Sequence, residues 1–365
     1  MSDKNHYCVL MAGGIGNHLW PLSRETRPNQ FIYAGSRQTS AFQNTLERCK
    51  NLVPKENILI VTLERFKHFI DEQAPEIPQE NVLLEPISRH TAPCVVYSTY
   101  TILRRNPDAV IAMIPVDQVI KEGKAFEETI TGALEYASSN DVLTAVGVLP
   151  SRPDPNYGYI QVVGGKKARN SAKPVKVKTF TEKPMPDIAQ AFCKSNEFFW
   201  NTGIYVWKAS VIREECEAHI PDITSALKEW EAAIGTPDEK RCLEKAYDDS
   251  VKLSIDYGVM EKTSRAWVYP AKFTWVDIDS WDNIYRHIDQ MDENGNALPY
   301  GPYLMKDNKD CIIYSRNKDK LIAVRGLENF MVIDTKDALL ICPKDEDLYK
   351  DFVCGTGFPD YEKFR

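Results

Sequence analysis

Short apolar runs rich in β-branched residues alternate with helical stretches through the first half of this 365-residue chain. The apolar runs are Tyr7–Met11, Ile58–Val61, Val82–Leu84, Ala109–Ile114 and Val142–Val146. The stretches between them are Thr39–Lys50, Glu64–Glu72, Thr91–Arg105 and Gly123–Ala137. Continuous apolar strands need cover on both faces, so this alternation predicts an α/β fold with a mostly parallel sheet between helices.

The middle of the chain is mixed. Strands are predicted at Tyr157–Val163 and Pro174–Thr179, on either side of a basic loop at Gly164–Arg169. Helices are predicted at Asp187–Lys194, Ala209–His219, Ile223–Ala233 and Glu239–Asp248. The segment Pro270–Trp281 brings two tryptophans back to the core.

After residue 291 the pattern changes to short strands with turn residues between them. These strands are Cys311–Ser315, Lys320–Val324, Phe330–Asp334 and Ala338–Ile341. Their regular spacing predicts a small all-β unit, a short solenoid of stacked strands. We therefore predict two domains, residues 1–291 and residues 292–365.

Composition and charge exclude several classes of protein. An apolar content of 43% supports a real core, and a net charge of −7 argues against a general nucleic-acid binder. The nine cysteines are scattered singly, which favours reduced core thiols over a disulfide framework or a zinc site. The start shows no signal peptide and no apolar run approaches the length of a membrane span, so we expect a cytoplasmic protein outside the membrane.

The first strand leads into a loop that holds three glycines: Gly13, Gly14 and Gly16. Glycines let a backbone turn its N–H groups toward a phosphate. The loop lacks the third glycine of a dinucleotide-binding fingerprint, where Leu19 stands, and it lacks the Gly-Lys-Ser/Thr of a P-loop. A tight turn would explain the glycines alone, but Arg24 and Arg27 follow, and arginine forks match phosphate oxygens.

Seven patterns, the first of which contains this glycine loop, follow one another along the chain: Met11–Arg24 with Pro28–Phe31, Leu84–Pro93, Pro115–Gln118, Phe180–Pro184, Trp200–Gly203, Ser254–Lys262 and Trp275–Trp281. In this order they resemble the sugar-1-phosphate nucleotidylyltransferases, most closely the mannose-1-phosphate guanylyltransferases in their short form without an isomerase domain. The resemblance runs nearly end to end. It implies a Rossmann-like, mostly parallel sheet with helices on both faces, of nucleotide-diphospho-sugar transferase type, and a small C-terminal left-handed β-helix unit.

The resemblance implies transfer of GMP from GTP to mannose 1-phosphate, which gives GDP-mannose and pyrophosphate and uses Mg²⁺. Such a transfer needs in-line positioning, a metal and positive charge around the phosphates. The implied catalytic residues are Arg24, Lys183 and Asp117, and the implied metal ligands are Asp117 and Asp277. The implied nucleotide contacts are Ala12, Gly13, Gly14, Gly16, Glu85, His90 and Thr91. The implied sugar-phosphate contacts are Gly158, Glu182, Lys183, Asn201, Thr202 and Glu261.

The sequence departs from the pattern of the family in four places. Asn17-His18 replaces Thr-Arg, Asn29 replaces a lysine, His90 replaces an asparagine and Asp279 replaces a glycine. Two cations are thereby lost beside the phosphates, since histidine carries little charge at pH 7. The loss of one electrostatic stabiliser costs on the order of a hundredfold in rate.

Two alternatives therefore stay open beside the transferase. One is a catalytically weak or inactive paralogue that binds nucleotide or nucleotide-sugar and regulates an active partner. The other is a transferase with altered nucleotide or sugar choice. The resemblance also allows a homodimer through the C-terminal β unit.

Overall fold

The computed structural model describes residues 4–16, 18–32, 39–278, 280–287, 291–298, 301–315, 317, 319–354 and 359–364. Packing divides the chain into two units. The first holds Met1–Gly14, Thr45–Val116 and Ile120–Trp275, and the second holds Ile15–Asn44, Asp117–Val119 and Val276–Arg365. Asn17 and Asp279 lie outside the described residues. A domain boundary between residues 291 and 292 stays a prediction.

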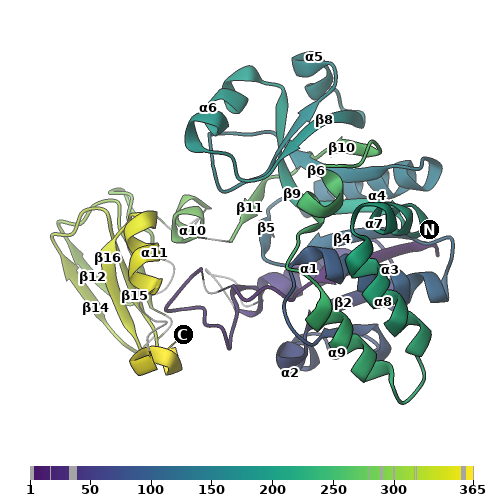
Figure 1. The fold of residues 1–365 in the computed structure, drawn as a ribbon. Helices are drawn as coiled ribbons and strands as arrows, with labels where there is room; N and C mark the ends of the chain where they lie inside the picture. The colour runs from purple at the N-terminus through teal and green to yellow at the C-terminus, as the bar shows by residue number, and fades with distance from the viewer. Residues whose placement is uncertain are drawn as a thin grey trace. The chain divides into compact units, whose positions relative to one another are not determined.

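A mixed sheet of nine strands forms the centre of the described part of the first unit (Figure 1), in the order β3-β2-β1-β4-β9-β6-β10-β8-β7. Its strands are β1 (His6–Met11), β2 (Ile58–Leu63), β3 (Val82–Glu85), β4 (Val110–Pro115), β6 (Leu143–Val148), β7 (Tyr159–Val162), β8 (Val175–Thr181), β9 (Phe198–Lys208) and β10 (Ala266–Pro270). Strands β3, β2, β1 and β4 are parallel, as predicted. The α/β fold class is confirmed.

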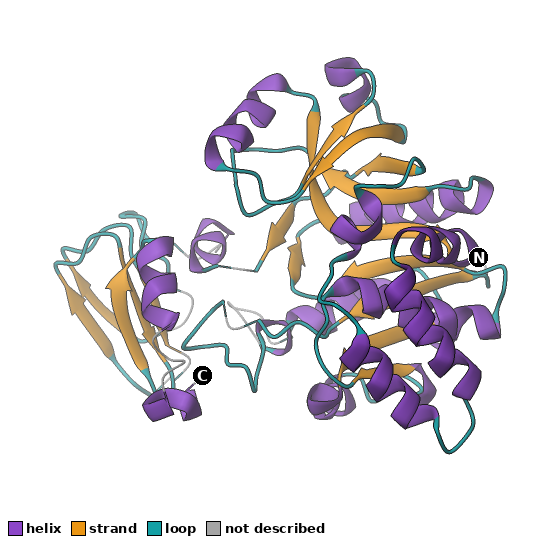
Figure 2. Cartoon of the chain, viewed as in Figure 1, coloured by secondary structure: helices purple, strands orange, loops and turns teal. Residues whose placement is uncertain are grey.

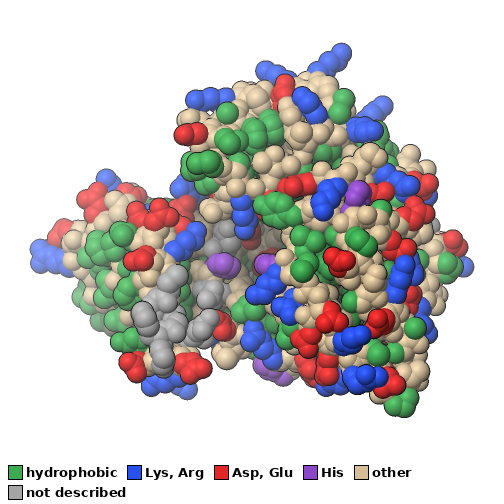
Figure 3. Space-filling model, viewed as in Figure 1, with side chains coloured by type: hydrophobic (Ala, Val, Ile, Leu, Met, Phe, Trp, Pro, Cys, Tyr) green, Lys and Arg blue, Asp and Glu red, His purple; other side chains and the backbone are tan. Residues whose placement is uncertain are grey.

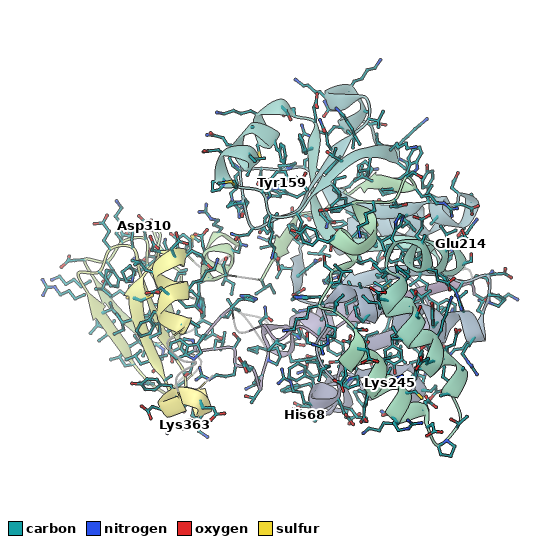
Figure 4. All side chains as sticks on the ribbon, in the orientation of Figure 1. His68, Tyr159, Glu214, Lys245, Asp310 and Lys363 are labelled. Carbon is teal, nitrogen blue, oxygen red and sulfur yellow. The ribbon has the colours of Figure 1, made fainter. Side chains whose placement is uncertain are left out.

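Strand β9 is the main feature that the apolar pattern did not predict. It runs antiparallel to β4 and β6, and its beginning also pairs with β7. Because β7 pairs with β8 as well, the far half of the sheet bends back on itself. Tyr159 on β7, labelled in Figure 4, is fully buried at this bend and packs on Phe192 with ring centroids 5.4 Å apart.

Helices cover both faces of this sheet, as Figure 2 shows. They are α1 (Ala41–Lys50), α2 (Lys67–Gln73), α3 (Thr91–Arg105), α4 (Gly123–Ser139), α5 (Gly165–Arg169), α6 (Pro186–Ser195), α7 (Ala209–His219), α8 (Pro221–Ala233) and α9 (Glu239–Asp249). Helices α3, α7, α8 and α9 share one core with alternate strand residues such as Val9. Helix α1 meets the other face, where the Cys49 thiol lies against that of Cys8. The prediction of a basic loop at residues 164–169 is wrong in part, because Gly165–Arg169 forms one helical turn.

Short turns and one small strand pair lie between these larger elements and beyond them. The 3-10 turns are η1 (Asn29–Phe31), η2 (Lys55–Asn57), η3 (Glu64–Phe66), η4 (Gln79–Asn81) and η7 (Pro359–Phe364), and a π turn, η5, spans Asp256–Met260. Strand β5 (Gln118–Ile120) pairs with β11 (Trp275–Asp277). On the face seen in Figure 3, acidic and basic side chains are interspersed over α2, α8 and α9, where ion pairs such as Lys245–Glu229 form.

The second unit contains the predicted stacked strands. Its elements are α10 (Trp281–His287), β12 (Tyr303–Lys306), β13 (Ile312–Ser315), β14 (Ile322–Arg325), β15 (Phe330–Asp334), β16 (Leu339–Pro343) and α11 (Glu346–Cys354). Strand β12 is parallel to β14 and β13 is parallel to β15, which confirms the solenoid. Antiparallel β16 ends it. The expectation of an all-β unit is wrong in one respect, because α11 follows and buries Tyr349 against the β13–β15 core.

The described cysteines are free thiols, as predicted. No helix in the described ranges is both long enough and apolar enough to cross a bilayer.

Candidate active site

The predicted site residues are divided between the two units. In the first unit, the glycine loop begins at Ala12, whose N–H donates to Val61 O at 2.8 Å. The carbonyl of Ala12 accepts a hydrogen bond from the Thr62 hydroxyl at 3.0 Å. Gly13 is partly buried and Gly14 is exposed. The start of the loop is thus tied to β2, while the backbone at Gly14 reaches the surface.

Glu85 ends β3 and is 4% exposed. Its Oε1 accepts a hydrogen bond from the Tyr247 hydroxyl of α9 at 3.0 Å. Its Oε2 would lie 2.5 Å from a Cβ atom at position 13, so only Gly13 allows the carboxylate to approach the loop. Burial raises the pKa of Glu85 to about 7. A carboxylate in this place is chemically able to accept hydrogen bonds from the N–H groups of a purine base.

The N-terminus of α3 carries the next two predicted nucleotide contacts. His90 is exposed and has φ 63° and ψ −159°, a region that residues other than glycine rarely adopt. Arg89 holds this turn by donating from Nε to Tyr247 O at 2.7 Å. Thr91 Oγ1 accepts the N–H of Ile255 at 2.9 Å. The Thr91 hydroxyl is therefore used in packing, whereas the His90 imidazole stays at the surface.

Glu182 and Gly158 meet at the bend of the sheet. A Cβ atom at position 158 would collide with Glu182 Oε2, so glycine is what admits the carboxylate. This oxygen is buried and accepts no hydrogen bond from any residue that the structure describes. Burial, followed by the charges of Asp256 and Glu261, raises the pKa of Glu182 to about 7, although Lys183 acts against this rise. A buried oxygen of this kind requires a proton or a donor from water or a ligand.

Thr202, Gly203 and Ile204 form a β-bulge in β9 directly after Asn201, where the register with β6 shifts. The Thr202 hydroxyl donates to Val146 O at 2.8 Å, and Gly203 takes φ 71°. The N–H of Asn201 donates to Gly158 O at 2.8 Å. Bulges re-aim side chains and are frequent beside active sites. This one places Asn201 beside Gly158 and commits the Thr202 hydroxyl to the backbone.

The Asn201 side chain lies in a hydrogen-bond network. Its Nδ2 donates to Tyr205 Oη at 2.9 Å and to Asp256 Oδ1 at 3.0 Å, and its Oδ1 accepts the N–H of Gly203 at 3.1 Å. The Tyr205 hydroxyl in turn donates to Asp256 Oδ1. Burial raises the pKa of Asp256, and these hydrogen bonds oppose the rise. Gly158, Glu182, Asn201 and Asp256 are called the sugar subsite below.

Lys183 and Glu261 lie at the rim of this subsite. Lys183 is exposed and has φ 46°, an uncommon conformation for a lysine. Glu261 is exposed, and its carboxylate accepts the backbone N–H of Glu182. Burial and the charge of Asp256 raise the pKa of Glu261. The turn after β8 thus directs Glu182 inward and leaves Lys183 in contact with solvent.

In the second unit, Gly16 and Asn29 close the glycine loop. Asn29 is 4% exposed, and its Nδ2 donates to Ile278 O at 2.8 Å. Its backbone N–H donates to Gly16 O at 3.1 Å. A Cβ atom at position 16 would collide with Asn29 Oδ1, so glycine is required there. Asn29 therefore fixes the loop from inside the unit, and the segment from Gly16 to Asn29 is called the phosphate loop below.

Arg24 and His18 belong to the phosphate loop. Arg24 Nη2 pairs with Asp337 Oδ1 at 3.0 Å, and its guanidinium lies 5.5 Å from the centroid of the Trp20 ring. Arg24 Nη1 is buried and donates no hydrogen bond within the described chain. His18 is exposed, and its carbonyl accepts the Tyr349 hydroxyl at 3.0 Å. A catalytic role for Arg24 stays a prediction, with Nη1 as the donor that could serve it.

Asp117 and Asp277 lie at neighbouring strand ends. Asp117 precedes β5 and Asp277 ends β11, and the N–H of Ile278 donates to Asp117 O at 3.1 Å. Within the described ranges, no three His, Cys, Asp or Glu side chains form a metal-binding group. Two hard carboxylates nevertheless suit Mg²⁺, which usually takes its remaining ligands from water and substrate phosphates. The donor set therefore fits Mg²⁺ held together with a phosphate ligand.

Sequence reasoning missed Tyr205, Tyr247 and Asp256. Asp256 lies within one of the seven patterns, Ser254–Lys262, and Tyr205 follows another closely. Their roles depend on partners on other elements, since Tyr247 and Glu85 are 162 residues apart. No local pattern of residue types signals such a contact.

The chain belongs to the nucleotidyl transferase family, whose model matches residues 7–294. The model of the MannoseP isomerase/GMP-like beta-helix domain matches residues 303–347, where the stacked strands lie. These matches and the relatives below confirm the family inferred from the seven patterns.

Two relatives carry the name mannose-1-phosphate guanylyltransferase. The one from Klebsiella pneumoniae is 32% identical over 98% of this chain and 76% of the relative. The second, from Escherichia coli O157:H7 and numbered 2, is 33% identical over 95% of this chain and 72% of the relative. A crystal structure described as mannose-1-phosphate geranyltransferase from Thermus thermophilus is 29% identical with a TM-score of 0.83, and the match covers 96% of this chain and 99% of that one.

Proposed function

We propose that the protein is a mannose-1-phosphate guanylyltransferase, which transfers GMP from GTP to mannose 1-phosphate. The observation that carries this proposal is the similarity, over nearly the whole chain, to two relatives of that name. The buried Glu182 oxygen that lacks a donor supports it, because a sugar hydroxyl would supply one.

The reaction needs positioning more than covalent help from the protein. A phosphate oxygen of mannose 1-phosphate attacks the α-phosphorus of GTP, the bond to the β-phosphate oxygen breaks, and pyrophosphate leaves. In this proposal Glu85 accepts hydrogen bonds from guanine, the glycine loop binds phosphate oxygens, and Lys183 binds the sugar phosphate. Asp117 and Asp277 would hold Mg²⁺, which supplies positive charge to the phosphates when bound.

One observation favours the second candidate, a paralogue that binds nucleotide and scarcely turns over. Asn29 is neutral, and its side chain is buried and bonded to Ile278 O, so this position of the phosphate loop supplies no cation. Arg24 is paired with Asp337. The names of the relatives favour the transferase over this candidate.

Release of pyrophosphate from GTP, mannose 1-phosphate and Mg²⁺ tests the proposal. Wild type is compared with Asp117→Ala and with Asp108→Ala, which alters an exposed aspartate. Release that Asp117→Ala abolishes and Asp108→Ala preserves supports the transferase. Binding of GTP or GDP-mannose in calorimetry without any release contradicts it and supports the regulatory candidate.

The remaining assignments rest on the same proposal. The partners are GTP and mannose 1-phosphate, and we propose that the protein acts in the cytoplasm. A homodimer through the C-terminal β unit stays a prediction, and sedimentation analysis of the full chain checks it.

A further inference from the structure

Two of the predicted sugar contacts, Asn201 and Glu182, differ in how many of their polar side-chain atoms remain available to a ligand. Asn201 gives both amide protons to protein acceptors, Tyr205 Oη and Asp256 Oδ1, and its own Oδ1 accepts the N–H of Gly203. Glu182 Oε2 is buried and accepts nothing from the described chain. A buried carboxylate oxygen without a donor is costly until a proton or a ligand satisfies it. Glu182, more than Asn201, is therefore available to an incoming hydroxyl.

Resting on the proposed function, we propose that Asp256 is a positioning residue of the sugar subsite. It holds the Asn201 amide and the Tyr205 hydroxyl in one network and leaves Glu182 as the acceptor offered to a hydroxyl of the sugar phosphate. The substrate class that this arrangement selects is a sugar 1-phosphate with a hydroxyl able to donate to that carboxylate. Asp256 itself acts through these neighbours.

The geometry of Asp256 suits this role. One of its oxygens, Oδ1, accepts hydrogen bonds from both Asn201 and Tyr205, and the Ser254 hydroxyl also bonds to its carboxylate. The residue opens the π turn η5, in which the N–H of Gly258 donates to Ser254 O at 2.9 Å. Gly258 packs closely against the side chains of Ile220 and Leu253. The backbone that carries Asp256 is thereby held by packing and hydrogen bonds within its own turn.

Asp256 also sets the electrostatic surroundings of Glu182. The charged and titratable groups that act on or are acted on by Glu182 are Lys183 on its own turn, Asp256, Tyr257 and Glu261 from η5 and the residue after it, and Tyr205 from β9. The negative charge of Asp256 disfavours the ionised form of Glu182. A sugar hydroxyl that donates to Glu182 favours that ionised form. Binding near neutral pH therefore releases a proton from Glu182.

Two variants, each of which removes one negative charge, distinguish the positioning role of Asp256 from a general effect of charge. Asp256→Asn removes one negative charge and alters the network, whereas Glu261→Gln removes one from an exposed carboxylate that contacts neither Asn201 nor Tyr205. kcat/KM for mannose 1-phosphate is measured from pH 5.5 to 8.5. In wild type we expect a fall on the acid side of neutrality. In Asp256→Asn we expect this limb to move down by about one pH unit, and in Glu261→Gln by less, because solvent screens an exposed charge.

A comparison of KM for the two substrates separates a positioning role from a merely structural one. Asp256→Asn and Tyr205→Phe are expected to raise KM for mannose 1-phosphate by about tenfold and to leave KM for GTP within about twofold. Circular dichroism and thermal melting establish whether each variant folds. If Asp256→Asn does not fold, the test relies on Tyr205→Phe. Equal changes in both KM values, or an unmoved acid limb in folded Asp256→Asn, overturn the inference.

Calorimetry keeps this test independent of turnover. Mannose 1-phosphate is titrated into the protein near pH 7 in two buffers of different ionisation enthalpy, which reports the protons released. We expect release in wild type, none in Glu182→Gln and less in Asp256→Asn. If pyrophosphate is never released but this pattern holds, the transferase proposal fails and the inference stands. If pyrophosphate is released and Asp256→Asn matches wild type in both assays, the inference alone fails.

Discussion

The sugar subsite of the first unit and the phosphate loop of the second treat charge in opposite ways. In the sugar subsite the Glu182 and Asp256 carboxylates are brought together, and neither forms an ion pair within 4.0 Å among the described residues. In the second unit charged groups are paired, as Arg24 is with Asp337 and buried Asp334 is with Lys320 at 2.7 Å.

The difference shows which residues of the seven patterns stabilise the fold and which remain available to a ligand. Gly16 and Asn29 keep the phosphate loop in place by contacts that need no charge. Glu182 keeps an oxygen without a donor, which stabilises nothing in the absence of a ligand. The phosphate loop is held by neutral contacts although it has fewer positive charges than the family pattern, whereas the sugar subsite keeps a buried carboxylate oxygen that a proton, water or a ligand has to satisfy.

The largest effect is expected from Lys183, the exposed cation at the rim of the sugar subsite. Lys183→Ala should lower kcat/KM for mannose 1-phosphate at least a hundredfold, roughly 3 kcal/mol of transition-state stabilisation, because the loop offers little charge in its place. The matched control is Lys178→Ala, an exposed lysine on β8. A loss below about fivefold would contradict the claim that Lys183 supplies the main positive charge of the site, since another cation would then have to bind the sugar phosphate.

Asn29 tests the claim that the phosphate loop is built for packing. Asn29→Lys places a charge in a buried site and removes the hydrogen bond to Ile278 O, so it should lower the free energy of unfolding by about 2–3 kcal/mol. Asn170→Lys, the same change at an exposed position, should have almost no effect. Urea denaturation measures both. Equal stability of the two variants would show that the loop tolerates a cation at position 29.

The pH dependence of stability extends the comparison to Glu85. Its pKa is raised to about 7 in the folded protein by burial, so the folded state holds a proton that the unfolded state releases near 4.5. The resulting stabilisation is complete below about pH 4.5 and is lost as pH rises through 7, a change of about 2.5 kcal/mol between pH 5 and pH 8. Urea denaturation at pH 5 and pH 8 should show this fall in wild type and in the exposed control Glu72→Gln. Glu85→Gln should show less of it, and an unchanged fall in that variant would contradict the prediction.

The smallest expected effect is a gain. His18 is exposed, so His18→Arg adds a cation to the phosphate loop without disturbing packing. We expect about a tenfold rise in pyrophosphate release, about 1.4 kcal/mol, with an unchanged melting temperature. His68→Arg, at an exposed position on α2 in the first unit, serves as the control for added charge. No gain in His18→Arg would mean that the lost arginine does not limit the rate.

Apolar patterning predicted the parallel half of the sheet and most helices, because burial on both faces leaves a readable period. It did not predict β9, since Asn201, Thr202 and Gly203 interrupt the apolar run with turn-forming residues where the structure forms a bulge. Gly164 and Gly165 likewise suggested a loop over residues 164–169, where the structure instead forms the single turn of α5.

The motifs located the candidate site but could not show which polar atoms are already used. Whether Asn201 is available to a sugar depends on Asp256, 55 residues further along the chain. Whether position 29 presents a polar group depends on Ile278, which is 249 residues away. Such contacts depend on tertiary packing, and the spacing of residues in the sequence does not predict them.

The hydroxyl of Tyr349 in α11 bonds to the carbonyls of His18 at 3.0 Å and Trp20 at 2.9 Å. The anchor of the phosphate loop is therefore made 331 residues after the loop itself. At ribosomal rates of about 5–20 residues per second, the loop waits roughly 15–70 s for this partner to be synthesised. A nascent chain thus has β1 (His6–Met11) available early and can complete the neighbouring loop only after Tyr349 has been synthesised.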